Sequence, residues 1–252
     1  MPSFRRSILI AAAAPLALAL AACDGEAGPP TGGPIAPIAA PAGQNWVDMA
    51  AETPEGGFVI GNPDAPLKLV EYASHTCSHC AAFAQEGRPE VEKLVAKGIV
   101  SYEIRNQLHD PIDMTIALLA RCSGDPARFH PLANQWWGDF QNVMSRVQTN
   151  GAALERANQA PQSKRLQAIA EAAGVLDFFT ARGLTREQAM ACLADIPKAQ
   201  AIADASERQS EELGVTGTPF FLLNGRPVEG TTWGPIQDSP GIEAALKAAG
   251  AR

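Results

Sequence analysis

The sequence predicts an α/β fold in which an all-helical domain is inserted into a domain with a central mixed sheet. Two strand-like apolar runs, 67–73 and 99–105, enclose a helix-like stretch. From 111 to 195 the chain has helical periodicity without a strand signal. A third apolar run at 220–223 ends in Asn224-Gly225, a dipeptide typical of hairpin turns. A helical block between two strand-bearing halves is most simply an insertion.

Composition limits the classes of partner. The chain has 252 residues, 46% of them hydrophobic, which is enough for a sizeable core in one or two domains. The formal net charge is -7 at pH 7. This sign disfavours binding to phosphate backbones and to anionic membrane surfaces. We therefore expect no nucleic-acid partner.

The N-terminus, 1–22, has the pattern of a secretion signal. Arg5 and Arg6 supply its positive charge, and the apolar stretch Ile8–Ala22 is shorter than the roughly 20 residues that span a bilayer. It ends in Leu20-Ala-Ala-Cys23, which resembles a bacterial lipoprotein box. We expect Cys23 to be lipidated and to anchor the protein to a membrane of the bacterial periplasm. The alternative is an ordinary signal cut after Ala22, which would leave Cys23 as a free thiol in an oxidising compartment.

Residues 23–45 are rich in Gly, Pro and Ala and have no periodic apolar face. This composition is typical of a flexible to semi-extended linker. We expect 23–45 to tether the folded domain to the anchor, with the domain boundary near Trp46.

The first half of the sheet domain, 46–107, contains a strand–helix–strand pattern. Strands are expected at 58–60, 67–73 and 99–105, and a helix at 80–97. Gly87 and Pro89 interrupt the helical pattern and predict a kink or break. The order predicts a right-handed parallel unit.

The helical insertion, 108–196, is followed by the second half of the sheet domain, 197–252. Helical periods within the insertion lie at 116–120, 129–147, 154–173 and 185–193. Thr185 with Gln188 three residues later has the form of a capping box. The second half contains an amphipathic helix at 198–213, a buried strand at 220–223, a short edge strand at 226–229 and a last helix at 241–249.

Two cysteines, in the sequence Cys77-Ser-His-Cys80, directly follow the central strand. Two cysteines three apart at the start of a helix can close a small disulfide and reopen it when a partner thiolate attacks. The helix N-terminus stabilises the first thiolate, which becomes a better nucleophile and leaving group. The pattern predicts a redox-active pair.

Cys122 and Cys192 are the remaining two cysteines. An even number of remaining cysteines in an exported protein suggests a structural disulfide between them. Its loop of about 70 residues would contribute at most roughly 4 kcal/mol. The alternative is two separate buried thiols that behave as small hydrophobes.

Together, Cys77-Ser-His-Cys80, the helical insertion and Gly217-Thr-Pro219 at the start of a later strand resemble the thioredoxin superfamily. Within it, the chain is similar to the exported DsbA-like thiol:disulfide oxidoreductases from about Phe58 to Gly250. The resemblance implies a thioredoxin-like fold without a cofactor, in the periplasm. It also implies exported protein substrates with thiols or disulfides, and a membrane redox partner.

The resemblance also implies site residues. Pro219 matches the family's cis-proline, which leaves the backbone of Thr218 free to pair with a substrate strand. Glu71, six positions before Cys77, matches a buried acid that accepts or relays the proton of the second cysteine. Desolvation would raise its pKa.

His79 matches the histidine of the Cys-Pro-His-Cys sequence of DsbA, which makes the disulfide oxidising. Ser78 replaces the proline of that motif, and Thr218 resembles the isomerase and reductase branches. The sequence therefore does not decide whether the protein acts as an oxidase or as an isomerase or reductase.

A second hypothesis is a copper- or zinc-handling periplasmic lipoprotein. His75, Cys77, His79 and Cys80 put two imidazoles and two thiols within six residues. Crowding makes coordination by all four awkward, so we expect no metal site. A third hypothesis, a scaffold without activity, is disfavoured because both cysteines are intact. Otherwise His75, His109 and His130 are expected to be structural or solvated, and Trp136 and Trp137 to be core or domain-packing residues.

Overall fold

A computed structural model describes residues 32–235 and 240–251 of the chain. The expected signal sequence, 1–22, and the lipidated Cys23 lie outside the described residues. Within the described ranges, no helix combines the length and the apolar character that crossing a bilayer requires.

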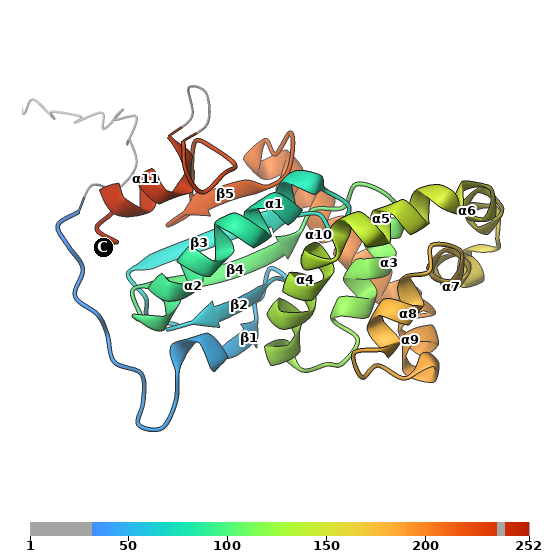
Figure 1. The fold of residues 1–252 in the computed structure, drawn as a ribbon, viewed down its shortest axis with the longest axis horizontal. Coiled ribbons are helices and arrows are strands. Elements are labelled where there is room, and N and C mark those ends of the chain that lie inside the picture. The colour runs from blue at the N-terminus through green and yellow to red at the C-terminus, as the bar shows by residue number, and fades with distance from the viewer. Residues whose placement is uncertain (1–31, 236–239, 252) are drawn as a thin grey trace, which may run out of the picture.

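A six-stranded mixed sheet forms the centre of the fold (Figure 1). Its strands are β1 (Ala50–Glu52), β2 (Phe58–Gly61), β3 (Leu67–Ala73), β4 (Val100–Asn106), β5 (Phe220–Leu223) and β6 (Arg226–Pro227). Their order is β1-β2-β4-β3-β5-β6, with β3 and β4 parallel and the other pairs antiparallel. In β3 every residue except Lys68 is buried, which explains the continuous apolar run of this central strand.

Helices α1 (Ser78–Glu86) and α2 (Arg88–Ala96) connect β3 to β4 across one face of the sheet (Figure 1). The break between them falls at Gly87, where a Cβ would collide with the ring of Phe83. Pro89 lies in the first turn of α2, where backbone N–H groups have no intrahelical acceptor. The missing N–H of proline therefore costs no hydrogen bond there. The expected interruption is therefore confirmed, and the parallel β3–α–β4 unit with it.

Seven helices between β4 and α10 lie together at one end of the sheet (Figure 1). They are α3 (Pro111–Ala120), α4 (Phe129–Gly138), α5 (Phe140–Thr149), α6 (Gly151–Asn158), α7 (Gln162–Ala172), α8 (Val175–Thr180) and α9 (Arg186–Leu193). The Thr185–Gln188 capping box is present at the start of α9. A disulfide joins Cys122, after α3, to Cys192 in α9, with 5.9 Å between their Cα atoms.

Helix α10 (Ile196–Leu213) returns the chain to β5, and α11 (Gly241–Ala248) follows the hairpin. Asn224 and Gly225 in the hairpin turn both have positive φ, 51° and 78°. Most buried apolar side chains of the sheet and of the helical insertion form one continuous cluster, and Val70, Tyr72 and Leu222 form a second, smaller one. The insertion therefore packs as part of the same core.

Four short elements were not expected from the sequence: the 3-10 helices Trp46–Asp48 and Pro126–Arg128, strand β1 and helix α8. Strand β1 has three residues, two of them exposed, so it shows no apolar run. Helix α8 has six residues, which is too short to display a helical period separate from α7. The expected edge strand at 226–229 is shorter, since only Arg226 and Pro227 pair with β5.

The described part of the expected tether, 32–45, contacts the folded domain. Gly32 and Ile35 donate backbone hydrogen bonds to carbonyls at the end of α11, and Ile38 donates to the carbonyl of Lys97, at 2.8 to 3.0 Å. The indole of Trp46 donates to the carbonyl of Ile38 at 2.7 Å. Segment 32–38 therefore contacts the folded domain through backbone bonds to distant elements, which composition does not reveal.

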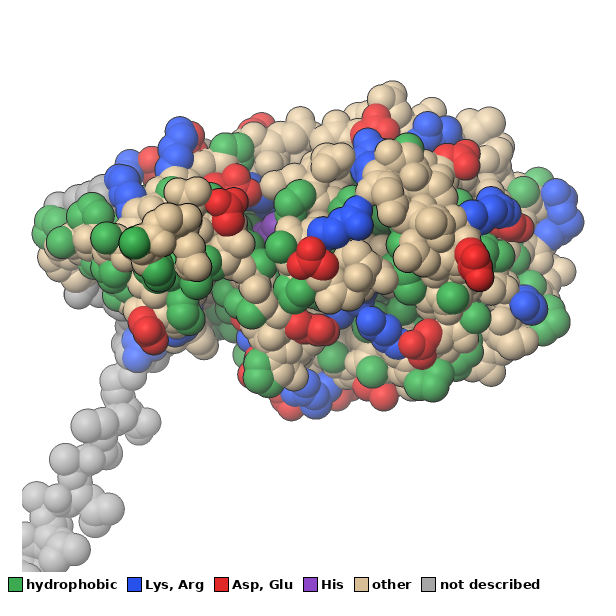
Figure 2. Space-filling view, turned by 90° about the horizontal axis from the view of Figure 1, so that it is seen from below, with side chains coloured by type: hydrophobic (Ala, Val, Ile, Leu, Met, Phe, Trp, Pro, Cys, Tyr) green, Lys and Arg blue, Asp and Glu red, His purple; other side chains and the backbone are tan. Residues whose placement is uncertain are grey.

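Charged side chains are mixed on the face of the molecule seen in Figure 2. Lys and Arg alternate there with Asp and Glu over the sheet end and the helical end alike. That face therefore has no extended patch of one sign, the feature that binding to a phosphate backbone requires.

Candidate active site

Strand β3 leads directly into the Cys-x-x-Cys turn. β3 ends at Ala73, three residues follow, and Cys77 is the N-cap of α1 with extended backbone angles (φ -90°, ψ 122°). Cys77 is 9% exposed, whereas Cys80, one turn into the helix, is 0% exposed. Both thiols are unbridged. Cys80 is therefore fully enclosed, whereas Cys77 keeps a small exposed surface.

The pKa of Cys77 is lowered to about 5. The largest cause is a hydrogen bond with the Cys80 thiol, and the Thr218 side chain and the backbone N–H groups of Cys80 and His79 add to it. Burial opposes them. Those two N–H groups are unpaired donors of the first turn of α1, so the helix N-terminus stabilises the thiolate as the sequence predicts.

The pKa of Cys80 is shifted in the opposite direction. Burial raises the pKa of Cys80 well above its ordinary value, and hydrogen bonding to Cys77 and the negative charge of Glu71 raise it further. At neutral pH the pair is thus one thiolate and one thiol. The thiolate is the reactive form in disulfide exchange, and of the two groups only Cys77 is in that form, while Cys80 keeps its proton.

Glu71 in β3 is completely buried behind the cysteines. Its Oε2 accepts hydrogen bonds from the Tyr102 hydroxyl and, at 3.3 Å, from Nη2 of Arg88, while Oε1 has no hydrogen-bond partner among the residues that the structure describes. Burial raises the pKa of Glu71, and the positive charge of Arg88 and the Tyr102 hydrogen bond limit the rise. The carboxyl group therefore keeps one buried oxygen free to carry a proton.

Arg88 and Tyr102 are members of the site that sequence reasoning missed. Arg88, at the start of α2, is 1% exposed, and its Nε donates to the Tyr102 hydroxyl at 3.2 Å. Its guanidinium group lies 4.6 Å from the ring centre of Trp137. Sequence alone shows Arg88 only as a charged residue among apolar positions at a helix break. It does not show the partner of Arg88, because Tyr102 lies on a distant strand.

Thr218 and Pro219 lie opposite Cys77, although 141 residues separate Thr218 from Cys77 along the chain. In its protonated form Cys77 donates to the carbonyl oxygen of Thr218, with Sγ 3.3 Å from that oxygen, and the Thr218–Pro219 bond is cis, as the resemblance implies. Within the described residues, the Thr218 N–H has no backbone partner. This edge of backbone is therefore available to another chain.

The four residues of the metal hypothesis separate in space. His79 is exposed on α1, whereas His75 is buried, with Nδ1 3.4 Å from Oδ1 of Asp113 and its ring stacked on Trp137. Throughout 32–235 and 240–251, no three His, Cys, Asp or Glu side chains are arranged to hold a metal ion. The arrangement does not support the second hypothesis.

Residues expected to be structural take specific positions around the site. Trp136 and Trp137 donate from their indoles to the carbonyls of His75 and Ser74, so the insertion holds the turn before Cys77. His109, given no role from the sequence, lies with Nε2 3.1 Å from the Thr218 hydroxyl.

His130 is a core residue. It donates from Nε2 to the carbonyl of Phe58 at 2.8 Å. Burial lowers the pKa of His130 to about 3, so the ring is neutral and structural.

Comparisons with known proteins agree with this geometry. A family model described as thioredoxin matches residues 53–237. Putative protein-disulfide oxidoreductases of Rickettsia bellii and Rickettsia prowazekii are 25% and 27% identical over 176 and 177 residues, 69% of this chain in each case. The chain spans 60% and 57% of the length of these relatives.

Two solved structures resemble the fold. A protein-disulfide isomerase from Novosphingobium aromaticivorans has a TM-score of 0.66 and 32% identity, covering 70% of this chain and 91% of that one. Alpha-DsbA1 from Wolbachia pipientis has a TM-score of 0.52 and 20% identity, covering 66% and 73%, and shows the fold alone. The chain therefore belongs to the thioredoxin family.

Proposed function

We propose that the protein is a thiol:disulfide oxidoreductase that exchanges disulfides with exported proteins through Cys77 and Cys80. The observation that carries the proposal is the position of the Cys77 thiol, 3.3 Å from the carbonyl of Thr218 beside a cis-proline. A nucleophile of low pKa there faces a backbone edge on which a substrate strand can pair.

The oxidising half-reaction begins with the Cys77–Cys80 disulfide. A substrate thiolate attacks Sγ of Cys77, a mixed disulfide forms, and Cys80 leaves as a thiolate that takes a proton by way of Glu71. A second substrate thiolate then attacks the substrate sulfur of the mixed disulfide, and Cys77 leaves as a thiolate. The substrate gains a disulfide, and two electrons pass to the cysteine pair.

The favoured direction is oxidation of substrate thiols. A stabilised Cys77 thiolate favours the reduced pair, so the disulfide form is the stronger oxidant. Isomerisation is the second candidate, because the 32% identical relative is described as a protein-disulfide isomerase. It would use the same attack by Cys77 on an incorrect substrate disulfide.

We further propose a periplasmic location, with Cys23 lipidated and a membrane redox partner that reoxidises the pair. The signal-like segment 1–22 and the box ending in Cys23 support this location. Mass measurement of the mature N-terminus tests it. A mature chain that begins at Cys23 and carries acyl chains is expected, and an unmodified thiol at position 23 would contradict the anchor.

Trapping the mixed disulfide tests the exchange chemistry. In Cys80→Ser the resolving thiol is absent, so a peptide disulfide should leave one covalent adduct on Cys77, located by peptide mapping. Cys77→Ser is the control and should form none. An adduct at another cysteine, or none in Cys80→Ser, would overturn the proposal.

A further inference from the structure

Asp113, in the first turn of α3, carries a completely buried carboxyl group that belongs neither to the cysteine pair nor to the Glu71 cluster. Its Oδ1 accepts a hydrogen bond from the backbone N–H of His75 at 2.9 Å. Its Oδ2 accepts one from the backbone N–H of His109 at 3.2 Å. The two oxygens of one side chain therefore bond to two separate loops.

Neither of these N–H groups has a backbone acceptor among the described residues. His75 lies in the turn between β3 and α1, and His109 lies between β4 and α3, so no helix or strand supplies one. His75 is completely buried, and a buried N–H without an acceptor costs about as much free energy as a lost hydrogen bond. Asp113 therefore replaces the acceptors that regular secondary structure would provide.

The bond to His75 acts close to the reacting sulfur, because His75 precedes Cys77 by only two residues. The helical insertion bonds to both sides of this residue. Its N–H donates to Asp113 in α3, and its carbonyl accepts from the indole of Trp136 in α4 at 2.8 Å. The turn that leads into Cys77 is therefore held by the insertion.

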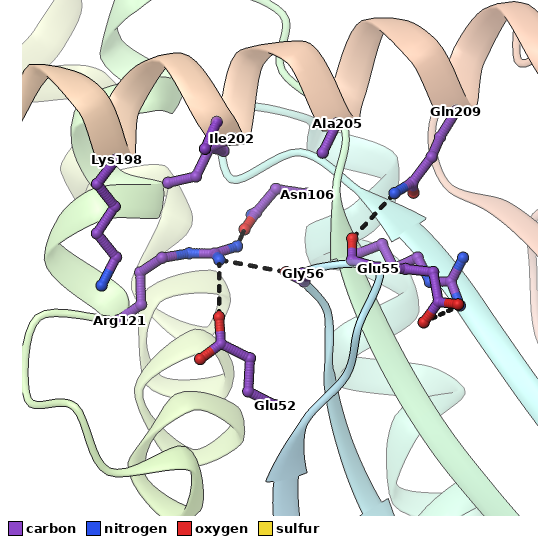
Figure 3. Close-up of a pocket in the computed structure, with 11 residues that line it drawn as sticks. Glu52, Glu55, Gly56, Asn106, Arg121, Lys198, Ile202, Ala205 and Gln209 are labelled. Carbon is purple, nitrogen blue, oxygen red and sulfur yellow. Dashed lines mark hydrogen bonds and ion pairs between the residues drawn. The ribbon is translucent and has the colours of Figure 1, made fainter.

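A second contact from α3 reaches His75 through Asn106, the last residue of β4. Nδ2 of Asn106 lies 3.3 Å from Nδ1 of His75. Oδ1 of Asn106 accepts a hydrogen bond from Arg121, the C-cap of α3, at the edge of a cavity of about 130 Å³ (Figure 3). Arg121 also donates to the carbonyl of Gly56 at 3.2 Å (Figure 3). The start and the end of α3 are therefore both connected to His75.

The bond to His109 leads to the other side of the Cys77 thiol. Nε2 of His109 lies 3.1 Å from the hydroxyl of Thr218, and the carbonyl oxygen of Thr218 lies 3.3 Å from Sγ of Cys77. Asp110, next to His109, accepts a hydrogen bond at 3.4 Å from the hydroxyl of Thr76. The loop between β4 and α3 therefore contacts the segments on both sides of the reacting sulfur.

We propose that Asp113 is a positioning residue for disulfide exchange, which holds Cys77 and the Thr218 backbone in one fixed geometry. It acts through the N–H groups of His75 and His109. The proposal rests on the proposed function and adds a residue to the same site. A substrate segment paired with Thr218 presents its disulfide to Sγ of Cys77 only while the two segments keep their spacing. A misplacement of about 1 Å between reacting groups can lower a rate about 100-fold.

The nearly isosteric substitution Asp113→Asn tests the proposal. The amide keeps one oxygen acceptor, but its NH₂ group is a donor. That donor would face the second backbone N–H, which would lose its partner. One of the two loops should therefore be released while the volume of the side chain is kept.

The matched control is Asn62→Ala, at another buried polar side chain that bonds to loop backbone. Asn62 accepts from the N–H of Asp64 at 2.9 Å and donates to the carbonyl of Gly98 at 3.1 Å. Gly98 precedes β4, at the end of the parallel β3–β4 pair opposite to Cys77. The control therefore removes buried hydrogen bonds without touching either loop at the thiol.

Two rates measured at pH 8 on the reduced protein separate positioning from a general loss of stability. The first is exchange with a peptide whose one cysteine forms a mixed disulfide with glutathione, which requires Cys77 and the Thr218 backbone together. The second is alkylation of Cys77 by iodoacetamide, located by peptide mapping, which requires only the thiolate. The ratio of the first rate to the second measures how well the two segments are placed.

Asp113→Asn should lower this ratio about tenfold, with the alkylation rate changed less than about twofold. Asn62→Ala should keep the wild-type ratio. A wild-type ratio in Asp113→Asn, or an equal fall in Asn62→Ala, would overturn the positioning role. If the wild-type protein were alkylated at Cys77 but did not exchange with the peptide, the proposed function itself would be overturned.

A measurement on the wild-type protein needs no substitution. Amide hydrogen exchange followed by NMR reports on each N–H separately. The amides of His75 and His109 should both be protected from exchange, although they lie outside helices and strands. Rapid exchange of either amide would show that Asp113 does not hold that loop, and would overturn the proposal.

Discussion

At the residue scale, the site depends on opposite shifts of two neighbouring thiols. Cys77 is stabilised as a thiolate by hydrogen bonds from the first turn of α1, and Cys80 is held as a thiol by burial. The spacing of the two cysteines predicts the first shift. The second depends on the enclosure of Cys80 by the rest of the core, which only the fold reveals.

The pH dependence of Cys77 follows from its lowered pKa. Its alkylation rate should rise with a midpoint near pH 5 and be level by pH 7, as followed by thiolate absorbance and by mass. Cys80→Ala removes the largest stabilising hydrogen bond, so the midpoint should move toward the ordinary value of 9.0. A midpoint above pH 8 in the wild-type protein would contradict this account.

The same shift links stability to pH in the reduced protein. The folded pKa of Cys77 lies below that of the unfolded chain, so the contribution is present above pH 9 and is lost as pH falls through about 5. The free energy of unfolding, measured with urea, should therefore fall with decreasing pH more for the reduced wild type than for Cys77→Ser. Equal pH profiles for the two proteins would count against it.

Arg88 carries a further prediction, because it is the positive partner of a buried acid. Arg88→Met leaves Glu71 without its ion pair and should reduce the free energy of unfolding by about 3–5 kcal/mol. Adding Glu71→Gln removes the remaining charge and should recover part of the loss. Urea unfolding measures both changes.

Arg208→Met is the matched control for Arg88, since Arg208 pairs with Glu212 on the surface of α10. It should change stability by less than about 1 kcal/mol. If Arg88→Met were no more destabilising than Arg208→Met, the buried ion pair would not make the predicted contribution to the free energy of unfolding.

At the element scale, the helical character of long periodic segments was predictable, but the breaks within 129–147 and 154–173, between α4 and α5 and between α6 and α7, were not. The central strand 67–73 and the break at Gly87 agree with the structure, since each depends on local sequence. Helix α8 is too short to show a period. The contact of Trp136 and Trp137 with the turn before Cys77 joins distant segments, so neither periodicity nor spacing reveals it.

The Cys122–Cys192 bridge connects the end of α3 to α9. Replacing both cysteines with Ala should lower the free energy of unfolding by up to about 4 kcal/mol, because the unfolded chain loses a constraint on a long loop. The rate of exchange at Cys77 should not change. Urea unfolding with and without reductant measures the first effect, and an unchanged stability would contradict a structural role.

At the scale of the whole molecule, one apolar core joins the sheet to the helical insertion. The insertion contributes the indoles that donate to the carbonyls of Ser74 and His75. The sequence indicated an inserted domain but not how closely it surrounds the cysteines. Residues such as Arg88, Tyr102 and His109 become part of the site only through this packing.

The reduction potential of the Cys77–Cys80 pair tests the central claim most directly. The stabilised Cys77 thiolate predicts a disulfide more oxidising than that of thioredoxin, about -270 mV, and shifted toward the roughly -120 mV of DsbA. Equilibration with glutathione buffers, with each form quantified by mass, gives the value. A potential at or below about -270 mV would contradict the claim that this pair is built to donate disulfides.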